Sequence, residues 1–150
     1  MNYSSKQYGL LSIGLIGFTV VAMVAVALTT ENPDVQVLCG VIALFFLGVG
    51  LVFMSLSVSV SDSSVGLSFG IGLIRREIPL ERIEAAEPVR NPWWYGFGIR
   101  RTPRGWMWNV QGLSAVELTY TDGGRFRIGT SDPEGLTQAI DAARMPQPPA

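Results

Sequence analysis

The residues best suited to recognising a partner lie in the segment 88–110. This segment combines four arginines with six aromatic side chains and contains no Asp or Glu. The flanking segments 59–87 and 111–150 each carry five acidic residues against three arginines, so positive charge is concentrated between them. Trp and Arg dominate the energetics of protein interfaces, and both are favoured at the level of lipid headgroups. The candidate binding residues are Trp93, Trp94, Arg100, Arg101 and Arg104.

Some of these aromatic side chains are expected to fill the core rather than to face solvent. Tyr95, Phe97 and Trp108 occupy alternating positions of predicted strands, which is typical of one buried sheet face. Trp93 and Trp94 are adjacent and follow an Asn-Pro pair in a predicted loop, so both side chains cannot point inward. The sequence therefore predicts that at least one of these two tryptophans is exposed.

Two interpretations of this surface remain open. An exposed Trp with nearby arginines suits docking on the anionic inner leaflet of a lipid bilayer, in a fixed pose for a protein partner. The same residues suit a hot spot that binds another protein, as in a subunit of a larger membrane complex. Nucleic acid is not an expected partner, because the net charge of the whole chain is −1.

The inventory of reactive side chains argues against an enzyme. The chain has no histidine and a single cysteine, Cys39, which excludes a disulfide framework and leaves no Cys/His set for zinc. The carboxylates between 77 and 87 have the spacing of surface residues. The Gly-x-Gly pairs at 70–72 and 96–98 lack the features of a phosphate loop and are interpreted as strand bulges. We expect no catalytic residue, no cofactor, no metal ion and no small-molecule substrate.

The elements that carry this surface begin with two apolar segments. Residues 7–30 and 35–61 contain no Asp, Glu, Lys or Arg. A helix needs about 20 apolar residues to cross a bilayer, and residues 9–28 and 35–56 each provide that length. The short connection between them contains Asn32-Pro33, which cannot continue a helix. The sequence predicts an antiparallel transmembrane hairpin.

The positive charges predict the orientation of the hairpin. Lys6 precedes the first helix and ten arginines follow the second, whereas the connection carries only Glu31 and Asp34. Cations favour the cytoplasmic side, so both termini, including residues 1–8, are expected in the cytoplasm. The predicted location is the cell (inner or plasma) membrane, with two passes.

The remainder of the chain, residues 57–143, alternates apolar and polar residues between glycine-containing turns. This pattern predicts seven or eight short strands in meander order that form a bent β-sheet or barrel. The most distinct hairpin flanks Asp122-Gly123-Gly124. Asp132-Pro133-Glu134 begins an amphipathic C-terminal helix, and residues 144–150 are expected to be disordered. The fold class is a membrane-anchored α+β protein. The expected strands are 56–61, 65–69, 73–78, 81–89, 95–101, 107–111, 115–121 and 125–130, and the last two form this hairpin.

Several of these runs resemble bacterial PH-like (pleckstrin-homology-like) domains. Val65-Gly66-Leu67-Ser68-Phe69-Gly70 and Arg75-Arg76-Glu77-Ile78-Pro79-Leu80-Glu81-Arg82-Ile83 are similar to the opening strands of such domains. The runs from Tyr95, from Asn109 and from Ile128 to Leu136 are similar to their later strands and terminal helix. The resemblance implies a PH-like domain after two transmembrane helices. Binding of phosphoinositides is not implied, because the loop Asp62-Ser63-Ser64 carries no cation.

Overall fold

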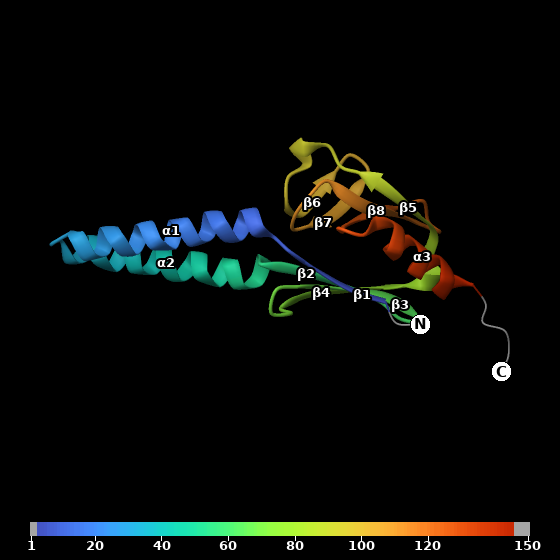
Figure 1. The fold of residues 1–150 in the computed structure, drawn as a ribbon, viewed down its shortest axis with the longest axis horizontal. Coiled ribbons are helices and arrows are strands. Elements are labelled where there is room, and N and C mark those ends of the chain that lie inside the picture. Colours follow the sequence, from blue (N-terminus) through green and yellow to red (C-terminus); the bar gives the residue numbers. More distant parts are fainter. Residues whose placement is uncertain (1–2, 146–150) are drawn as a thin grey trace.

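The computed structural model describes residues 3–145 and shows a long helical hairpin that projects from a body of two β-sheets (Figure 1). The hairpin consists of α1 (Leu10–Thr29) and α2 (Pro33–Phe53), which pack against each other. Asn32 caps α2, since its side chain accepts hydrogen bonds from the backbone N–H groups of Asp34 and Val35. The two predicted helices are thus present, with ends shifted by one to three residues.

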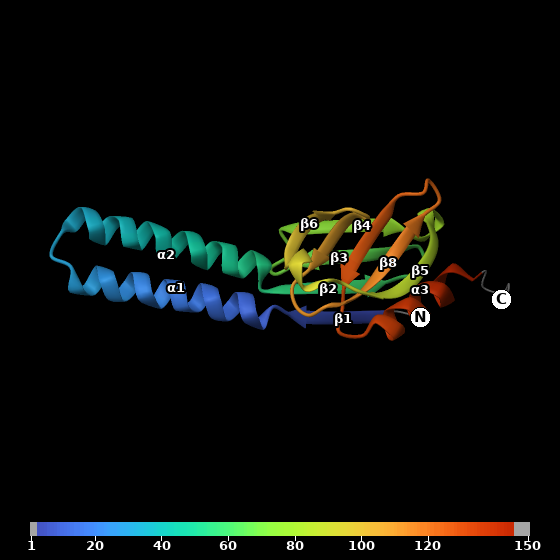
Figure 2. The same ribbon diagram turned by 90° about the horizontal axis from the view of Figure 1, so that it is seen from above.

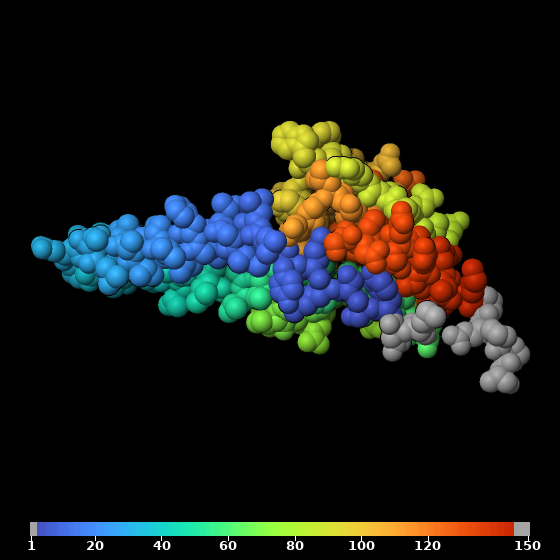
Figure 3. Space-filling model, in the orientation of Figure 1, coloured from blue at the N-terminus to red at the C-terminus, as the bar shows by residue number. Residues whose placement is uncertain are grey.

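Both helices are apolar on all sides and stand clear of the body (Figure 3). The mean hydropathy of each helix is 2.5. In the most apolar 18-residue stretch, 0% of α1 and 6% of α2 is buried within the protein. They are long and apolar enough to cross a membrane.

The first sheet contains four antiparallel strands in the order β1-β2-β3-β4. Three of them follow the sequence prediction, but the N-terminal strand does not appear in it. Its residues, YSSKQY, are mostly polar, so no alternation of apolar residues indicated a strand. It is nevertheless paired along its whole length with the strand that follows α2. The strands are β1 (Tyr3–Tyr8), β2 (Ser55–Val60), β3 (Ser64–Phe69) and β4 (Ile74–Pro79).

The second sheet contains five strands in the order β5-β8-β9-β7-β6, and β7 runs parallel to β9. The expected meander and barrel are therefore wrong: the strands described between residues 3 and 145 form two separate sheets that do not close. Pro79 ends β4 and a single turn of 3₁₀ helix, η1 (Leu80–Arg82), carries the chain to the other layer. The strands are β5 (Ile83–Arg90), β6 (Gly98–Thr102), β7 (Gly105–Asn109), β8 (Ser114–Tyr120) and β9 (Arg125–Gly129).

The two sheets face each other across the hydrophobic core, and α3 (Pro133–Arg144) packs on β2, β5 and β8 at one open side. This amphipathic helix confirms the prediction. Asp132 caps it by accepting a hydrogen bond from the Gly135 N–H, and Leu136 and Ile140 are fully buried. The predicted hairpin at Asp122-Gly123-Gly124 is confirmed between β8 and β9. The tail beyond residue 145 lies outside the described residues.

The sheet and the helical hairpin join without a linker (Figure 2). Only Gly9 separates β1 from α1 and only Met54 separates α2 from β2, and the Gly9 N–H donates a 2.9 Å hydrogen bond to the Met54 carbonyl. The Gln111 side chain accepts a 3.0 Å hydrogen bond from the Leu10 N–H at the start of α1. These bonds fix the direction of the hairpin relative to the body.

Candidate interaction surface

The two adjacent tryptophans occupy a single 3₁₀ turn, η2 (Trp93–Tyr95), between β5 and β6. Pro92 begins the turn, and Gly96, with a positive φ of 66°, ends it. We call residues 91–97 the Trp loop. Its two tryptophans are 77% and 67% exposed, so the prediction that at least one is exposed is confirmed. Because the turn occupies residues 93–95, the strand expected from Tyr95 begins only at Gly98.

Buried polar side chains hold the Trp loop on the outer face of the second sheet. Asn91 is buried, and its side-chain oxygen accepts a 2.9 Å hydrogen bond from Arg127 of β9. Arg127 also forms a 2.7 Å ion pair with Glu117 of β8, and its guanidinium lies 5.7 Å from the centre of the Tyr95 ring. The Asn91 N–H donates a 2.6 Å hydrogen bond to the Leu113 carbonyl. The loop is therefore anchored at its start by Asn91 and near its middle by Tyr95.

Sequence reasoning missed this buried network. Glu117 and Arg127 are directly opposite each other in the β8–β9 hairpin. Extending the predicted hairpin residue by residue from its turn would have placed these opposite charges side by side. The role of Asn91 had no comparable signal, because its partner is 36 positions away in the chain.

The three candidate arginines do not form one cluster. Arg100 lies beneath the Trp loop and donates a 2.7 Å hydrogen bond from Nε to the Phe97 carbonyl. Arg101, the next residue of β6, points to the opposite face of the sheet, where its cross-strand partner is Trp106. Arg104 lies in the turn between β6 and β7, at the other end of β6 from the Trp loop. All three are exposed, but only Arg100 accompanies Trp93 and Trp94.

The Gly-x-Gly segments that were interpreted as bulges are not bulges. Gly70 and Gly72 belong to the β3–β4 turn, and Gly96 and Gly98 flank the step from the Trp loop into β6. All four have positive φ angles, which glycine adopts without steric cost. Turns and bulges both use glycines with positive φ. The Gly-x-Gly pattern therefore could not distinguish a bulge from a turn.

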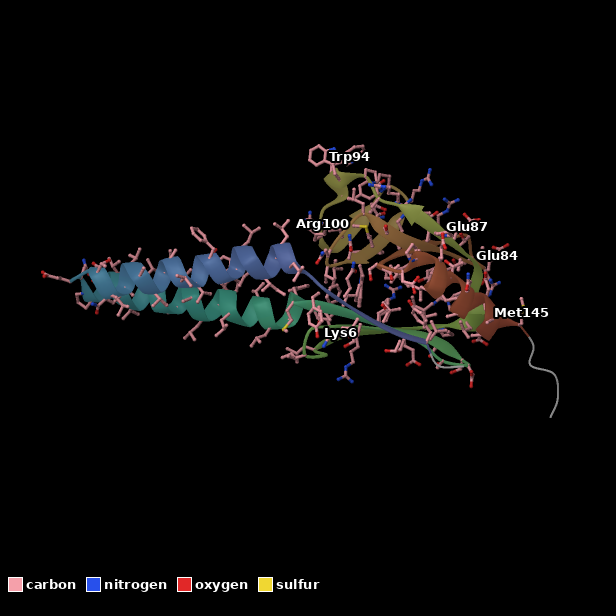
Figure 4. The ribbon with its side chains drawn as sticks, viewed as in Figure 1. Lys6, Glu84, Glu87, Trp94, Arg100 and Met145 are labelled. Atoms are coloured by element: carbon pink, nitrogen blue, oxygen red, sulfur yellow. The ribbon has the colours of Figure 1, made fainter. Side chains whose placement is uncertain are left out.

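The Trp loop lies at the end of the body that meets the helices. A small crevice of about 210 Å³ separates Phe97 and Gly98 from Ile16 of α1 and Val49 of α2. Figure 4 shows Trp94 and Arg100 near the helix ends, and Glu84 and Glu87 farther from them. No protein-family model and no curated protein matches this chain. The surface is therefore interpreted from its geometry alone.

This surface combines large aromatic rings with a nearby cation. Two large, amphipathic indole rings project from a rigid loop, with one guanidinium group directly behind them. The carboxylates labelled in Figure 4 lie away from this end of the body. Trp93 and Trp94 meet edge to face, with 6.0 Å between their ring centres, so they present one continuous aromatic tip.

Proposed function

We propose that this protein is a membrane-tethered binding or scaffolding module without catalytic activity. The helical hairpin spans the cell membrane, and the body is a PH-like domain on the cytoplasmic side. The Trp loop docks on the cytoplasmic leaflet and holds the body in a fixed pose, in which it recruits or stabilises a protein partner.

The composition and exposure of the hairpin support the membrane-spanning part of the proposal. At about 1.5 Å per residue, helices of 20 and 21 residues match the thickness of a bilayer core, which is about 30 Å. In water, two helices that are apolar on every side would expose a very large apolar surface. Lys6 and ten arginines are at the end that carries the body, whereas the α1–α2 connection carries Glu31 and Asp34, which supports a cytoplasmic body.

A body of β-strands followed by a C-terminal helix supports the PH-like part of the proposal, since the sequence resemblance implied strands and a terminal helix in this order. The strand β1, which comes before the hairpin, is an addition to the resembling region.

The observation that carries the docking proposal is the rigid placement of Trp93 and Trp94 beside the helix ends. Because single residues join the sheet to both helices, the body cannot rotate freely away from the bilayer. The exposed indole rings are then held close to the headgroup region, where Trp is favoured. Arg100 behind them is attracted to anionic lipids by about 1 kcal/mol.

Quenching of tryptophan fluorescence by brominated lipids tests this proposal. The full chain is reconstituted into vesicles with and without brominated acyl chains. We expect the wild-type emission to be partly quenched, and the quenched fraction to disappear in the double variant Trp93→Phe/Trp94→Phe. Trp106 and Trp108 on β7 remain in both proteins as an internal reference.

Phe preserves the apolar character of the loop, so the double variant changes the reporter rather than the fold. Wild-type emission that brominated lipids do not quench would contradict docking on the leaflet. That result would favour the alternative in which the Trp loop is covered by another protein.

A further inference from the structure

The β3–β4 turn carries a second exposed apolar tip, which the proposed function does not use. We refer to residues 70–73 as the Ile/Leu turn. Ile71 is 59% exposed and Leu73 is 71% exposed, and both lie between strands whose other apolar side chains face the core. Single exposed apolar residues are common on protein surfaces. The position of this pair relative to the helices is what distinguishes it.

The Ile/Leu turn packs directly on the last turn of α2. The Gly70 N–H donates a 2.8 Å hydrogen bond to the Ser55 carbonyl. Gly70 has a φ of 47°, and a Cβ atom at this position would overlap the carbonyl oxygens of Leu51 and Val52. Since α2 ends at Phe53, these carbonyls belong to its last turn, and the Ile/Leu turn lies against the C-terminal end of the apolar helix.

The turn is also stiff. The Gly72 N–H donates a 2.7 Å hydrogen bond to the Phe69 carbonyl, and Arg75 donates a 2.7 Å hydrogen bond from Nε to the Gly72 carbonyl. The side chains of Ile71 and Leu73 therefore project from a fixed backbone. Little backbone conformational entropy remains to be lost when these side chains are covered.

The neighbouring surface indicates what covers these side chains. The adjacent face of α2 is apolar, and Leu51 is itself 45% exposed, so the tip extends the surface that is proposed to contact acyl chains. Exposed cations follow on the side away from the helices. Lys6, Ser57, Ser68 and Arg75 form one cross-strand row of the first sheet, with a cation at each end. An apolar tip followed by cations matches the order of acyl chains and anionic headgroups in a leaflet.

We infer that the Ile/Leu turn inserts into the leaflet at the boundary between the headgroups and the acyl chains. Figure 1 shows this turn on the α2 side of the hairpin and the Trp loop on the α1 side. The body then contacts the bilayer on two opposite sides of the hairpin. This inference rests on the proposed function, because it requires the hairpin to span the membrane.

Site-specific fluorescence tests the inference. Cys39, the sole cysteine, is replaced (Cys39→Ala), and single cysteines are introduced as Ile71→Cys or Leu73→Cys. Each is labelled with an environment-sensitive nitrobenzoxadiazole probe, and the full chain is reconstituted into vesicles. We expect blue-shifted emission that lipid-borne nitroxides quench and aqueous iodide does not.

Two control positions separate the outcomes. Thr121→Cys is exposed beside the β8–β9 turn, where the probe should be quenched by iodide and not by nitroxide lipids. Trp94→Cys reports on the Trp loop. Aqueous behaviour at Ile71 and Leu73 with lipid quenching at Trp94 would overturn the inference and leave the proposed function standing. Aqueous behaviour at all four positions would overturn both.

Discussion

At the scale of single residues, the Arg127–Glu117 ion pair is buried and the Arg82–Asp122 ion pair is exposed. In the Arg127–Glu117 pair each side chain is 7% exposed, and its atoms approach to 2.7 Å. In the Arg82–Asp122 pair the side chains are 55% and 63% exposed, with a separation of 3.4 Å. Loss of one partner from a buried pair leaves an uncompensated charge, whereas water solvates the remaining charge of an exposed pair.

We expect Arg127→Met to lower the free energy of unfolding by about 3 kcal/mol, near the lower end of the range for a broken buried pair. The lower end applies because Arg125 remains within 3.1 Å of Glu117. The matched variant Arg82→Met should cost about 0–1 kcal/mol. Urea titration in detergent, followed by near-ultraviolet circular dichroism, measures both values. Equal losses would contradict the structural role assigned to Arg127.

The five candidate site residues show what residue-level prediction can and cannot provide. Exposure of at least one of the adjacent tryptophans follows from their position after an Asn-Pro pair, since a loop there cannot bury two consecutive large rings. The separation of Arg100 from Arg101 follows from strand geometry, in which neighbours point to opposite faces. Arg104 follows β6 whereas the Trp loop precedes it, so the two lie at opposite ends of this strand.

At the scale of elements, the prediction succeeded where local chemistry determines the structure. The two apolar helices, the β8–β9 hairpin and α3 each have their own cap, turn or periodicity. It failed where pairing joins distant parts of the chain. β1 lacks an apolar pattern and is held by pairing with β2, and the parallel contact of β7 with β9 has no local signal.

The Ile/Leu turn provides a test at this scale. We expect Gly70→Ala to destabilise the body by considerably more than Gly123→Ala. Both glycines have positive φ, which costs an L-residue about 1–2 kcal/mol, but only Gly70 is pressed against the backbone of α2. Thermal unfolding of the detergent-solubilised full chain measures both variants. Similar shifts in melting temperature would show that the turn is not packed on the helix.

At the scale of the whole molecule, the pairing of β1 with β2 places both ends of the hairpin in the same body. The segments before α1 and after α2 must therefore lie on the same side of any membrane that the hairpin crosses. The α1–α2 connection is at the other end of the hairpin (Figure 1). The sequence predicted this arrangement from two antiparallel spans, with the charges giving the side, and the strand pairing provides an independent geometric reason.

Labelling with a membrane-impermeant maleimide tests the arrangement. In a Cys39→Ala background, we expect Glu31→Cys to react in right-side-out membrane vesicles and Thr121→Cys to react only in inside-out vesicles. The connection faces outward and the body faces the cytoplasm in the proposed orientation. Reaction of Thr121→Cys in right-side-out vesicles would contradict the cytoplasmic placement.

The position of β1 ahead of the hairpin also has a consequence for biosynthesis. The ribosome synthesises residues 3–8 before the hairpin, but their partner strand, residues 55–60, emerges only after both helices have been made. Strand β1 therefore remains unpaired with β2 while both helices are being synthesised. Pairing of β1 with β2 thus follows synthesis of the whole hairpin, and a chain that stalls before residue 55 leaves β1 without its partner strand.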